Sequence, residues 1–244
     1  MITKKSIIEN IKTIIYALII AIIIRSLLIQ PFYIPSSSME SGLLVGDRLF
    51  VTKFSYGYSK HSFPFSPPIF KGRFFFSEPK RGDVIVFKTP SDNRTDYIKR
   101  LIGVPGDEIK FIDGELFLNN NQILRTVESL EANLFCGKEL INVNKYSEKL
   151  PNGKQYIASY RLDYSFKNSD KYVVPKDHYF FLGDNRDCSK DSRFLSEVGY
   201  VHRNNLVGKA QILFFSSDPL KGSIIKFWTW HKIFRFDRFF KKII

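Results

Sequence analysis

One apolar stretch near the N-terminus restricts how this chain can fold. Residues 13–29 are almost wholly aliphatic, and Arg25 and Ser26 interrupt them near the far end. The stretch is just long enough to cross a bilayer, which takes about 20 residues with a range of about 17–25. Arg25 lies near its end, from which a long basic side chain can reach the lipid headgroups. We therefore predict a transmembrane anchor over residues 13–29.

A cleaved signal peptide and a buried core helix are the two other interpretations of this stretch. A cleavable signal is followed by small residues in an Ala-x-Ala-like pattern, whereas residues 30–35 read QPFYIP. This difference favours an uncleaved anchor. Lys4, Lys5 and Lys12 precede the span, so the positive-inside rule predicts a cytoplasmic N-terminus over residues 1–12. The rest of the chain would then lie on the outer, periplasmic face of the cell membrane.

The net charge of +13 at pH 7 is concentrated at the two ends of the chain. Residues 1–30 carry four basic residues against one acidic residue, and residues 221–244 carry seven against one. Only a small positive excess remains in between, which is a poor electrostatic footprint for DNA or RNA. We expect no nucleic-acid partner.

The C-terminal segment, residues 218–244, interleaves aromatic and basic residues. This composition suits the headgroup layer of a membrane, where rings are buried and cations meet anionic lipid. We therefore predict a membrane-surface tail. The alternative is a C-terminal helix that packs on its own domain.

The chain has two cysteines, Cys136 and Cys188. A pair in an extracytoplasmic domain can be bridged, but the count alone leaves the pairing open. The sequence contains no Cys-x-x-Cys motif and no His-rich cluster with metal-ligand spacing. We expect no metal and no other cofactor.

After the anchor, short β segments separated by turn residues predict an antiparallel, mainly β fold, and no long helical period interrupts residues 32–217. Asp113-Gly114 is favoured in type I′ hairpins. The predicted strands are 48–54, 84–88, 97–104, 108–112, 115–119, 155–162, 179–182 and 207–215.

Two stretches interrupt this pattern. Residues 57–79 combine four prolines with six phenylalanines, which indicates either an extended loop with rings in lipid or a covered β-ribbon in the core. Residues 120–175 are polar and irregular, so we expect an insertion outside the catalytic core.

A serine and a lysine far apart in the sequence indicate hydrolytic chemistry. Ser38 lies in the run 35–39 (PSSSM), and Lys99 lies in a predicted strand. A serine hydroxyl is a poor nucleophile until a base takes its proton. Lowering a lysine pKa by about two units from about 10.4 destabilises the charged form by roughly 3 kcal/mol. Burial against Tyr97 and Ile98 can supply this, and Lys99 would then be a base near neutral pH.

A third cluster, residues 183–193 (GDNRDCSKDSR), is dense in short polar and charged side chains. Glycine and asparagine permit tight turns, and the alternating Asp and Arg residues allow internal ion pairs. The cluster lacks the spacing and terminal Glu of an EF-hand loop.

Together these motifs give the chain a resemblance to the bacterial type I signal peptidases, or leader peptidases. These are membrane-bound Ser/Lys proteases that remove signal peptides from exported preproteins. The similarity covers the anchor and four ordered segments, 31–39 with Gly46-Asp47, 80–87, 97–107 and 183–193. The resemblance implies an antiparallel, barrel-like catalytic domain of coiled sheets over residues 30–217. It also implies preprotein substrates cut after small residues.

The resemblance also implies roles for individual residues. Ser38 would be the nucleophile and Lys99 the general base, and the Ser36 hydroxyl would join the Ser38 backbone N–H in the oxyanion hole. Ser189 would orient Lys99. Asp191 and Arg193 would form a structural ion pair, which Asp184 would join. Apolar pockets for the substrate's small residues would be lined by Phe32, Ile34, Met39, Leu43, Tyr97 and Ile98.

Two positions depart from the family pattern. Residues 40–42 (ESG) replace a turn that often contains proline, and Cys188 stands where asparagine is common. The first departure puts the loop after the nucleophile in doubt, and the second the packing beside Ser189.

Three rival interpretations remain. A histidine triad would use Ser38 with His61, His178 or His202 and an aspartate. A self-cleaving repressor also uses Ser and Lys, but would have a DNA-binding domain in place of the anchor. The non-enzymatic alternative is a membrane-tethered β scaffold whose tail binds lipid.

Overall fold

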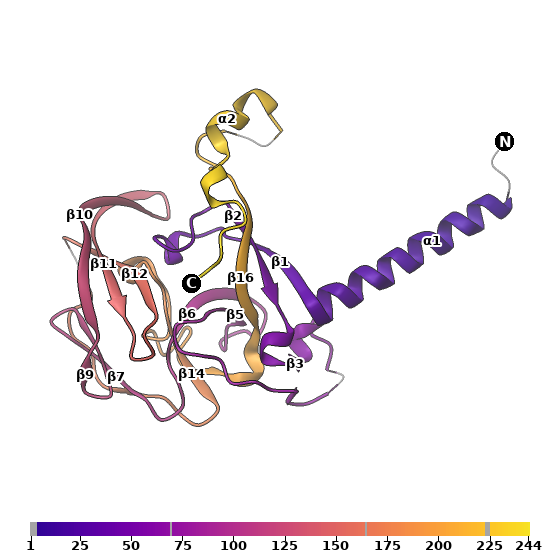
Figure 1. Cartoon of the computed structure of the whole chain (residues 1–244). Coiled ribbons are helices and arrows are strands. Elements are labelled where there is room, and N and C mark those ends of the chain that lie inside the picture. Colours follow the sequence, from indigo (N-terminus) through magenta and orange to yellow (C-terminus); the bar gives the residue numbers. More distant parts are fainter. Residues whose placement is uncertain (1–3, 69, 164, 223–224) are drawn as a thin grey trace.

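The first element is a long helix that stands away from the rest of the molecule (Figure 1). The structure is a computed structural model that describes residues 4–68, 70–163, 165–222 and 225–244, and the predicted segments 1–12, 57–79, 120–175 and 218–244 each lose one to three residues to these gaps. Helix α1 (Lys4–Ile23) continues into a π-helical turn (Ile24–Leu28). Its candidate membrane span, Ile7–Leu28, has 22 residues and a mean hydropathy of 2.2. The span therefore begins six residues before the predicted boundary.

A curled antiparallel sheet of seven strands forms the centre of the domain, which confirms the mainly β prediction (Figure 1). Its strand order is β1-β2-β16-β5-β6-β14-β15. Most predicted strands fall within two residues of the observed ones. The bounds are β1 (Ile29–Tyr33), β2 (Asp47–Thr52), β5 (Val84–Lys88), β6 (Asp96–Gly103), β14 (His178–Leu182), β15 (Val201–His202) and β16 (Leu206–Ser216).

The polar segment 120–175 contains the longest hairpin of the described chain, contrary to the prediction of irregular structure. Strands β10 (Leu124–Cys136) and β11 (Glu139–Lys149) pair with each other, and β12 (Gln155–Arg161) pairs with β11. Most residues of β10 are exposed, and its register shifts twice between Val127 and Ala132. With so few buried positions and an irregular ladder, β10 lacks the apolar alternation that identifies a strand.

A smaller sheet packs beside this hairpin. Its order is β13 (Tyr172–Val173), β7 (Glu108–Ile112), β8 (Glu115–Leu118) and β9 (Asn121–Gln122). Asp113 and Gly114 between β7 and β8 have φ angles of +49° and +80°. Positive φ at both central residues is what a type I′ turn requires, so the hairpin prediction is confirmed.

Within residues 57–68 and 70–79, irregular segments flank a two-stranded ribbon, β3 (Tyr58–Ser59) and β4 (Arg73–Phe74). Phe65 is fully exposed and Phe75 is 87% exposed. These two rings are not covered by the domain. The remaining turns are 3-10 helices at Ser37–Met39, Phe54–Tyr56, Lys60–Ser62, Arg186–Cys188, Arg203–Asn205, Phe227–Thr229 and Phe236–Arg238.

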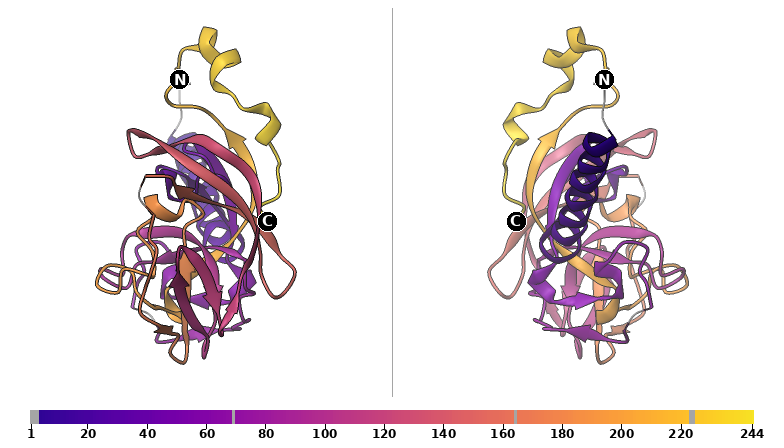
Figure 2. Two further views of the ribbon diagram at one scale, coloured as in Figure 1. Left: turned by 90° about the vertical axis from the view of Figure 1, so that its left-hand side faces the viewer. Right: turned by 90° about the vertical axis from the view of Figure 1, so that its right-hand side faces the viewer.

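The C-terminal tail is partly packed and partly exposed. The short helix α2 (Trp230–Ile233) buries Ile233, and Arg238 forms an ion pair with Asp47 at 2.6 Å. In contrast, Phe227 and Trp228 are exposed. Figure 2 shows α2 at the top of the domain, whereas Figure 1 shows that α1 projects from the right-hand side of the domain.

Candidate active site

Ser38 lies in the 3-10 turn Ser37–Met39, which follows β1 at the edge of the main sheet. The apolar residues around this turn fix its orientation, because Ile34, Met39 and Leu43 all pack into one buried cluster beneath it. The turn is therefore anchored from below by apolar burial.

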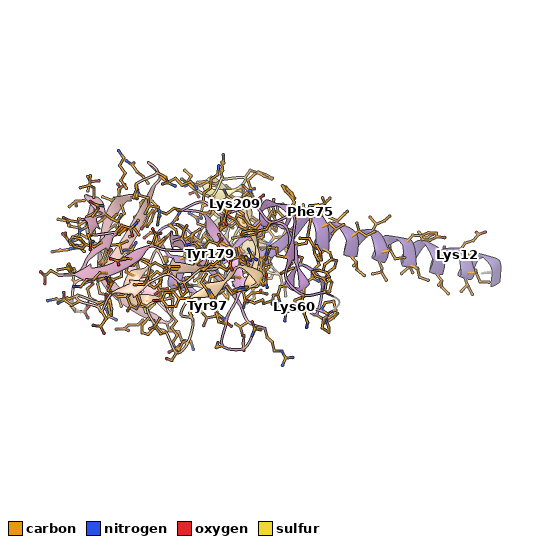
Figure 3. All side chains as sticks on the ribbon, turned by 90° about the horizontal axis from the view of Figure 1, so that it is seen from below. Lys12, Lys60, Phe75, Tyr97, Tyr179 and Lys209 are labelled. Atoms are coloured by element: carbon orange, nitrogen blue, oxygen red, sulfur yellow. A yellow bond between two sulfur atoms is a disulfide. The ribbon has the colours of Figure 1, made fainter. Side chains whose placement is uncertain are left out.

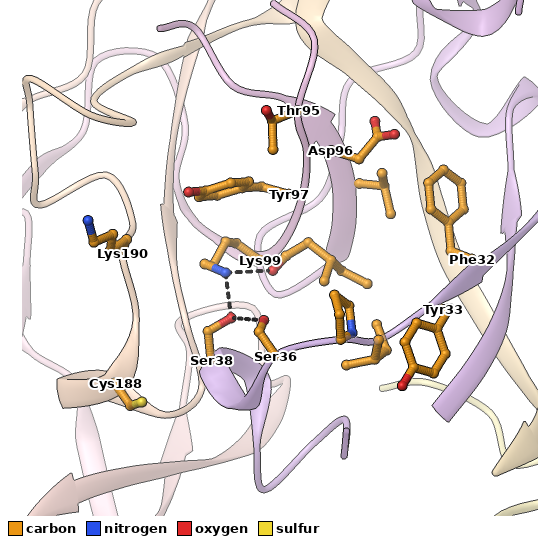
Figure 4. Close-up of a pocket in the computed structure, with 14 residues that line it drawn as sticks. Phe32, Tyr33, Ser36, Ser38, Thr95, Asp96, Tyr97, Lys99, Cys188 and Lys190 are labelled. Carbon is orange, nitrogen blue, oxygen red and sulfur yellow. Dashed lines mark hydrogen bonds between the residues drawn. The ribbon is translucent and has the colours of Figure 1, made fainter. Parts of the chain in front are cut away.

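Lys99 lies in β6 and reaches Ser38 across the cleft. Its side chain is buried, and its Nζ donates to Ser38 Oγ at 2.7 Å and to the Ile98 carbonyl at 3.0 Å (Figure 4). Ser36 Oγ lies 3.4 Å from Ser38 Oγ. A nucleophile and a base within direct hydrogen-bond reach form the arrangement that covalent catalysis requires.

Burial lowers the pKa of Lys99 to about 8, because the charged amine loses its hydration. Asp191 and Asp184 act in the opposite direction and favour the charged form. Each of these carboxylates already has an arginine partner. Arg100 contacts Asp184 at 2.7 and 2.8 Å, and Arg193 contacts Asp191 at 2.8 and 2.9 Å. Because both acids are paired with arginines, burial dominates, and Lys99 loses its proton much closer to neutral pH than an exposed lysine does.

The segment 183–193 approaches both members of this pair. A Cβ added at Gly183 would lie 2.2 Å from Ser189 Oγ and 2.5 Å from the Ser38 carbonyl oxygen, so only glycine fits there. Ser189 is buried, and no hydrogen bond of its Oγ to Lys99 is present in the structure. It lies near the Asp191 carboxylate instead and helps to keep the pKa of that group low.

A disulfide joins Cys136 at the tip of the β10–β11 hairpin to Cys188, beside Ser189. The sequence left this pairing open, and the only signal near it was the cysteine in place of asparagine at position 188. The hairpin tip also touches the 3-10 turn Ser37–Met39, because the Gly137 N–H donates to Ser37 Oγ at 3.1 Å. The supposed insertion is thus part of the site's framework.

Asn185 links the 3-10 turn Ser37–Met39, the segment 183–193 and the β10–β11 hairpin. Its backbone N–H donates to the Ser38 carbonyl at 3.1 Å, and its Nδ2 donates to the carbonyls of Ser37 at 3.2 Å and Phe135 at 3.4 Å. Asn185 is completely buried. It therefore fixes the turn that carries Ser38 to both the 183–193 segment and the β10–β11 hairpin.

A second buried ion pair ties the hairpin to the 183–193 segment. Arg186 contacts Glu148 of β11 at 2.6 and 3.0 Å, and the hydroxyls of Tyr156 and Tyr160 donate to the same carboxylate at 2.6 and 2.5 Å. Both charged side chains are 1% exposed. A buried pair this fully hydrogen-bonded holds its two elements in one geometry.

The cleft beside Ser38 has a volume of about 530 Å³ and mainly apolar walls. Four of the six predicted pocket residues line it: Phe32, Ile34, Tyr97 and Ile98. Met39 and Leu43 do not line it, because they point into the core beneath the turn. The wall residues that were not predicted are Tyr33, Pro35, Val86, Thr95, Asp96, Cys188 and Lys190, most of which belong to β1, β6 and their flanks.

The histidines of the rival triad lie elsewhere. His61 contacts Ser66 Oγ at 2.9 Å, and His178 and His202 lie against each other with ring centroids 5.0 Å apart. None of the three lines the cleft around Ser38. The arrangement around Ser38 therefore favours lysine as the base.

The family model and the relatives that match this chain are described as signal peptidases. The family described as "Signal peptidase, peptidase S26" matches residues 7–215. The signal peptidase I of Rickettsia typhi is 39% identical over 99% of this chain and 96% of its own length. That of Rickettsia prowazekii is 41% identical over 93% and 90%. A crystal structure of a signal peptidase I from Enterococcus faecalis covers 55% of this chain and 97% of its own, with 27% identity and a TM-score of 0.34.

Proposed function

The chain belongs to the peptidase S26 family of signal peptidases, and on this premise we propose that Ser38 and Lys99 are the dyad with which it cleaves signal peptides. The observation that carries the proposal is the direct contact of 2.7 Å between Ser38 Oγ and the buried amine of Lys99. The family accounts for the serine peptidase activity and for preproteins as substrates. The assignment of roles to residues is our own.

The reaction begins with neutral Lys99, whose Nζ lone pair accepts the Ser38 hydroxyl proton. Ser38 Oγ attacks the carbonyl carbon before the scissile bond, and the resulting oxyanion accepts hydrogen bonds from the Ser36 hydroxyl and the Ser38 backbone N–H. The Lys99 ammonium then gives its proton to the departing amine. Lys99 next deprotonates a water that hydrolyses the acyl-enzyme, which releases the signal peptide and restores Ser38.

The apolar cleft is the proposed site for the small residues before the cut. Phe32, Ile34, Tyr97 and Ile98 offer rings and branched side chains close to Ser38. In this scheme alanine-sized side chains leave the carbonyl carbon within reach of Ser38 Oγ, whereas larger ones against the same walls would push it away. Asp191 and Arg193 act in this scheme as a structural pair that holds the 183–193 segment against Lys99.

The proposed topology places residues 1–12 in the cytoplasm, the anchor within the membrane and the domain 30–217 on the outer face. The lysines before the span support this orientation. Protease added outside spheroplasts should digest the domain but spare a tag on the N-terminus. Digestion of the tag alone would reverse the topology.

The tail 218–244 is proposed to lie on the membrane surface. Its support is the exposure of Phe227 and Trp228 and the basic residues that alternate with the tail's aromatic rings. The chain's two tryptophans, Trp228 and Trp230, both lie in this tail. Brominated lipids should therefore quench the protein's tryptophan fluorescence. Unchanged fluorescence would place the tail in water.

The dyad is tested with the full-length protein in detergent and a preprotein substrate. Ser38→Ala and Lys99→Ala should each lower kcat by about 10³-fold or more. His178→Ala and the exposed-lysine variant Lys110→Ala serve as controls and should keep wild-type activity. Full activity of Lys99→Ala would rule out the dyad, and loss of activity only in a histidine variant would restore the triad.

A further inference from the structure

A second hollow, which we call the foot pocket, lies where the anchor meets the domain. It has a volume of about 330 Å³, and its walls include Arg25 from the end of the helix and Lys88, Arg94 and Asp96 from β5, β6 and the turn between them. Phe65 of the loop 57–79 forms part of its rim. The foot pocket shares Phe32 and Asp96 with the cleft beside Ser38. It therefore adjoins the proposed active site without containing either member of the dyad.

Positive charge in the foot pocket exceeds negative charge. Lys88 forms an ion pair with Asp96 at 2.9 Å, and that carboxylate is the only acidic group in the wall among the residues that the structure describes. Within the same described residues, no carboxylate contacts the guanidinium of Arg25 or Arg94. Two cations thus converge on a concave site with no anion of the protein to match them.

Two basic side chains near the wall, Lys53 and Arg73, add to the excess of positive charge around the foot pocket. Lys53 is 1% exposed, and the neighbouring charges of Arg25 and Lys88 add to the burial that lowers its pKa to about 8. Arg73 donates to carbonyl oxygens and the Ser59 hydroxyl rather than to a carboxylate. Burial and the surrounding lysine and arginine charges lower the pKa of His61 to about 4, so it adds no charge at neutral pH.

The position of the foot pocket at the end of the candidate membrane span indicates which anion it binds. Arg25 lies in the last turn of the candidate span Ile7–Leu28, and Gln30, another wall residue, follows that span by two positions. An anchor that crosses a bilayer over this range ends at the headgroup layer, where the phosphates lie. Figure 3 shows Phe75 and Lys60 close to the place where α1 joins the domain.

Two exposed phenylalanine rings, one on the rim of the foot pocket and one near the base of α1, also fit a position at the headgroup layer. Phe65 and Phe75 are exposed with φ angles of +62° and +51°, which bulky residues rarely adopt. A domain surrounded by water gains nothing from holding two phenylalanine rings outward. At a membrane, each ring can enter the boundary between headgroups and acyl chains while the cations next to it contact phosphate.

We propose that the foot pocket binds the phosphate of an anionic phospholipid headgroup, with Arg25, Lys88 and Arg94 around the phosphate and Phe65 in the adjoining acyl layer. The bound lipid would fix the height of the domain above the membrane. Because the cleft shares Phe32 and Asp96 with the foot pocket, it would also fix the height at which a signal peptide meets Ser38. The proposal rests on membrane insertion of α1 and is independent of the roles of Ser38 and Lys99.

The test uses the full-length protein in phosphatidylcholine vesicles that contain a trace of spin-labelled phosphatidylglycerol or spin-labelled phosphatidylcholine. Electron paramagnetic resonance reports the fraction of each label that the protein immobilises. Wild type should prefer phosphatidylglycerol. Arg25→Gln/Arg94→Gln, which removes the two cations that have no carboxylate partner, should weaken that preference by about fivefold for each cation removed.

The matched control is Lys110→Gln/Lys167→Gln, which removes the same charge from exposed lysines around the β7–β8 hairpin, at the far end of the domain. It should keep the wild-type preference. Equal weakening in both double variants would mean that net charge and not the foot pocket attracts the lipid, and the proposal would fall.

Two further outcomes would also overturn it. Displacement of labelled phosphatidylglycerol by excess inorganic phosphate would identify a site for free phosphate. If neither label were immobilised by wild type, α1 would not be inserted, and the topology as well as the foot pocket would be rejected. Cleavage of a preprotein in detergent is measured separately, so failure of the dyad and failure of the foot pocket remain distinguishable.

Discussion

Lys99 and Arg100 are neighbours in β6, yet the structure treats their charges in opposite ways. Both side chains are buried. Arg100 holds Asp184 through two hydrogen bonds, whereas Lys99 contacts a hydroxyl and a carbonyl and no carboxylate. Burial with a partner preserves a charge, and burial without one favours the neutral form. One strand thus supplies a permanent cation to the framework and a titratable amine to the cleft.

The same contrast separates two regions. Behind the cleft lies a paired layer, which we define as the ion pairs Arg100–Asp184, Arg186–Glu148 and Arg193–Asp191. In front of it, the cleft presents Lys99 against apolar walls. The layer satisfies the very carboxylates that would otherwise return Lys99 to its charged form. The framework therefore stabilises the loop and also tunes the base.

Lys99→Arg is the most direct way to break this contrast. Arginine keeps the positive charge and the length, but its guanidinium cannot be deprotonated in a protein. We expect kcat to fall by about 10³-fold or more, with the substrate's KM much less affected. The measurement is single-turnover cleavage of a preprotein, with Lys110→Arg as the control. Near-normal turnover would show that Lys99 does not act as a base.

Asp184→Asn breaks the pairing of Arg100 and leaves a buried guanidinium without its counter-charge. Removing one partner of a buried pair destabilises a protein by about 3–5 kcal/mol. Chemical denaturation in detergent should show a loss of this size. The matched control is Asp163→Asn, whose exposed carboxylate pairs with Arg161 and should contribute about 0–1 kcal/mol. An equal loss of stability in the two variants would show that the buried pair Arg100–Asp184 stabilises the protein no more than an exposed pair does.

Cys136→Ser/Cys188→Ser tests whether the hairpin holds the paired layer against the cleft. The bridge closes a loop between residues 52 positions apart, so its loss should lower the free energy of unfolding by about 2–4 kcal/mol. We also expect a lower kcat, since Cys188 adjoins Ser189. Reduction of wild type by dithiothreitol should reproduce both effects. An unaltered kcat in the reduced protein would show that the disulfide to the hairpin is not needed for catalysis.

Arg193→Gln should produce the smallest change in kcat and the most specific one, while the loss of stability should resemble that of Asp184→Asn because Asp191 is left buried without its counter-charge. Without its arginine, Asp191 would act more strongly on Lys99 and raise the pKa of the amine above about 8. Because only neutral Lys99 accepts the Ser38 proton, the acid limb of the profile of kcat against pH should move to higher pH, by about one unit or less. Arg161→Gln is the control. A profile that stays in place while stability falls would make Arg193 purely structural.

Sequence patterns anticipated most of the main sheet, and they singled out Ser38 and Lys99, which the structure places in contact. Strands such as 84–88 are short apolar runs, and Asp113-Gly114 carries its turn type in two residues. The β10–β11 hairpin escaped because most of β10 faces water and its ladder is irregular. Met39 and Leu43 were assigned to the substrate pocket because proximity to Ser38 in the sequence does not say which way a side chain points. The 3-10 turn directs both into the core.

The anchor, the mainly β fold and the candidate nucleophile and base were determined by the sequence itself, since hydropathy, alternation and turn chemistry are local properties. Tertiary structure alone decided what those residues can do. It joined Cys136 to Cys188, paired Glu148 with Arg186 and brought Ser38 within 2.7 Å of Lys99. These contacts link residues 38 to 61 positions apart, and no local pattern encodes them. The pKa of Lys99 depends on the same packing, because a lysine loses its charge only where the whole fold excludes water and gives each nearby acid another partner.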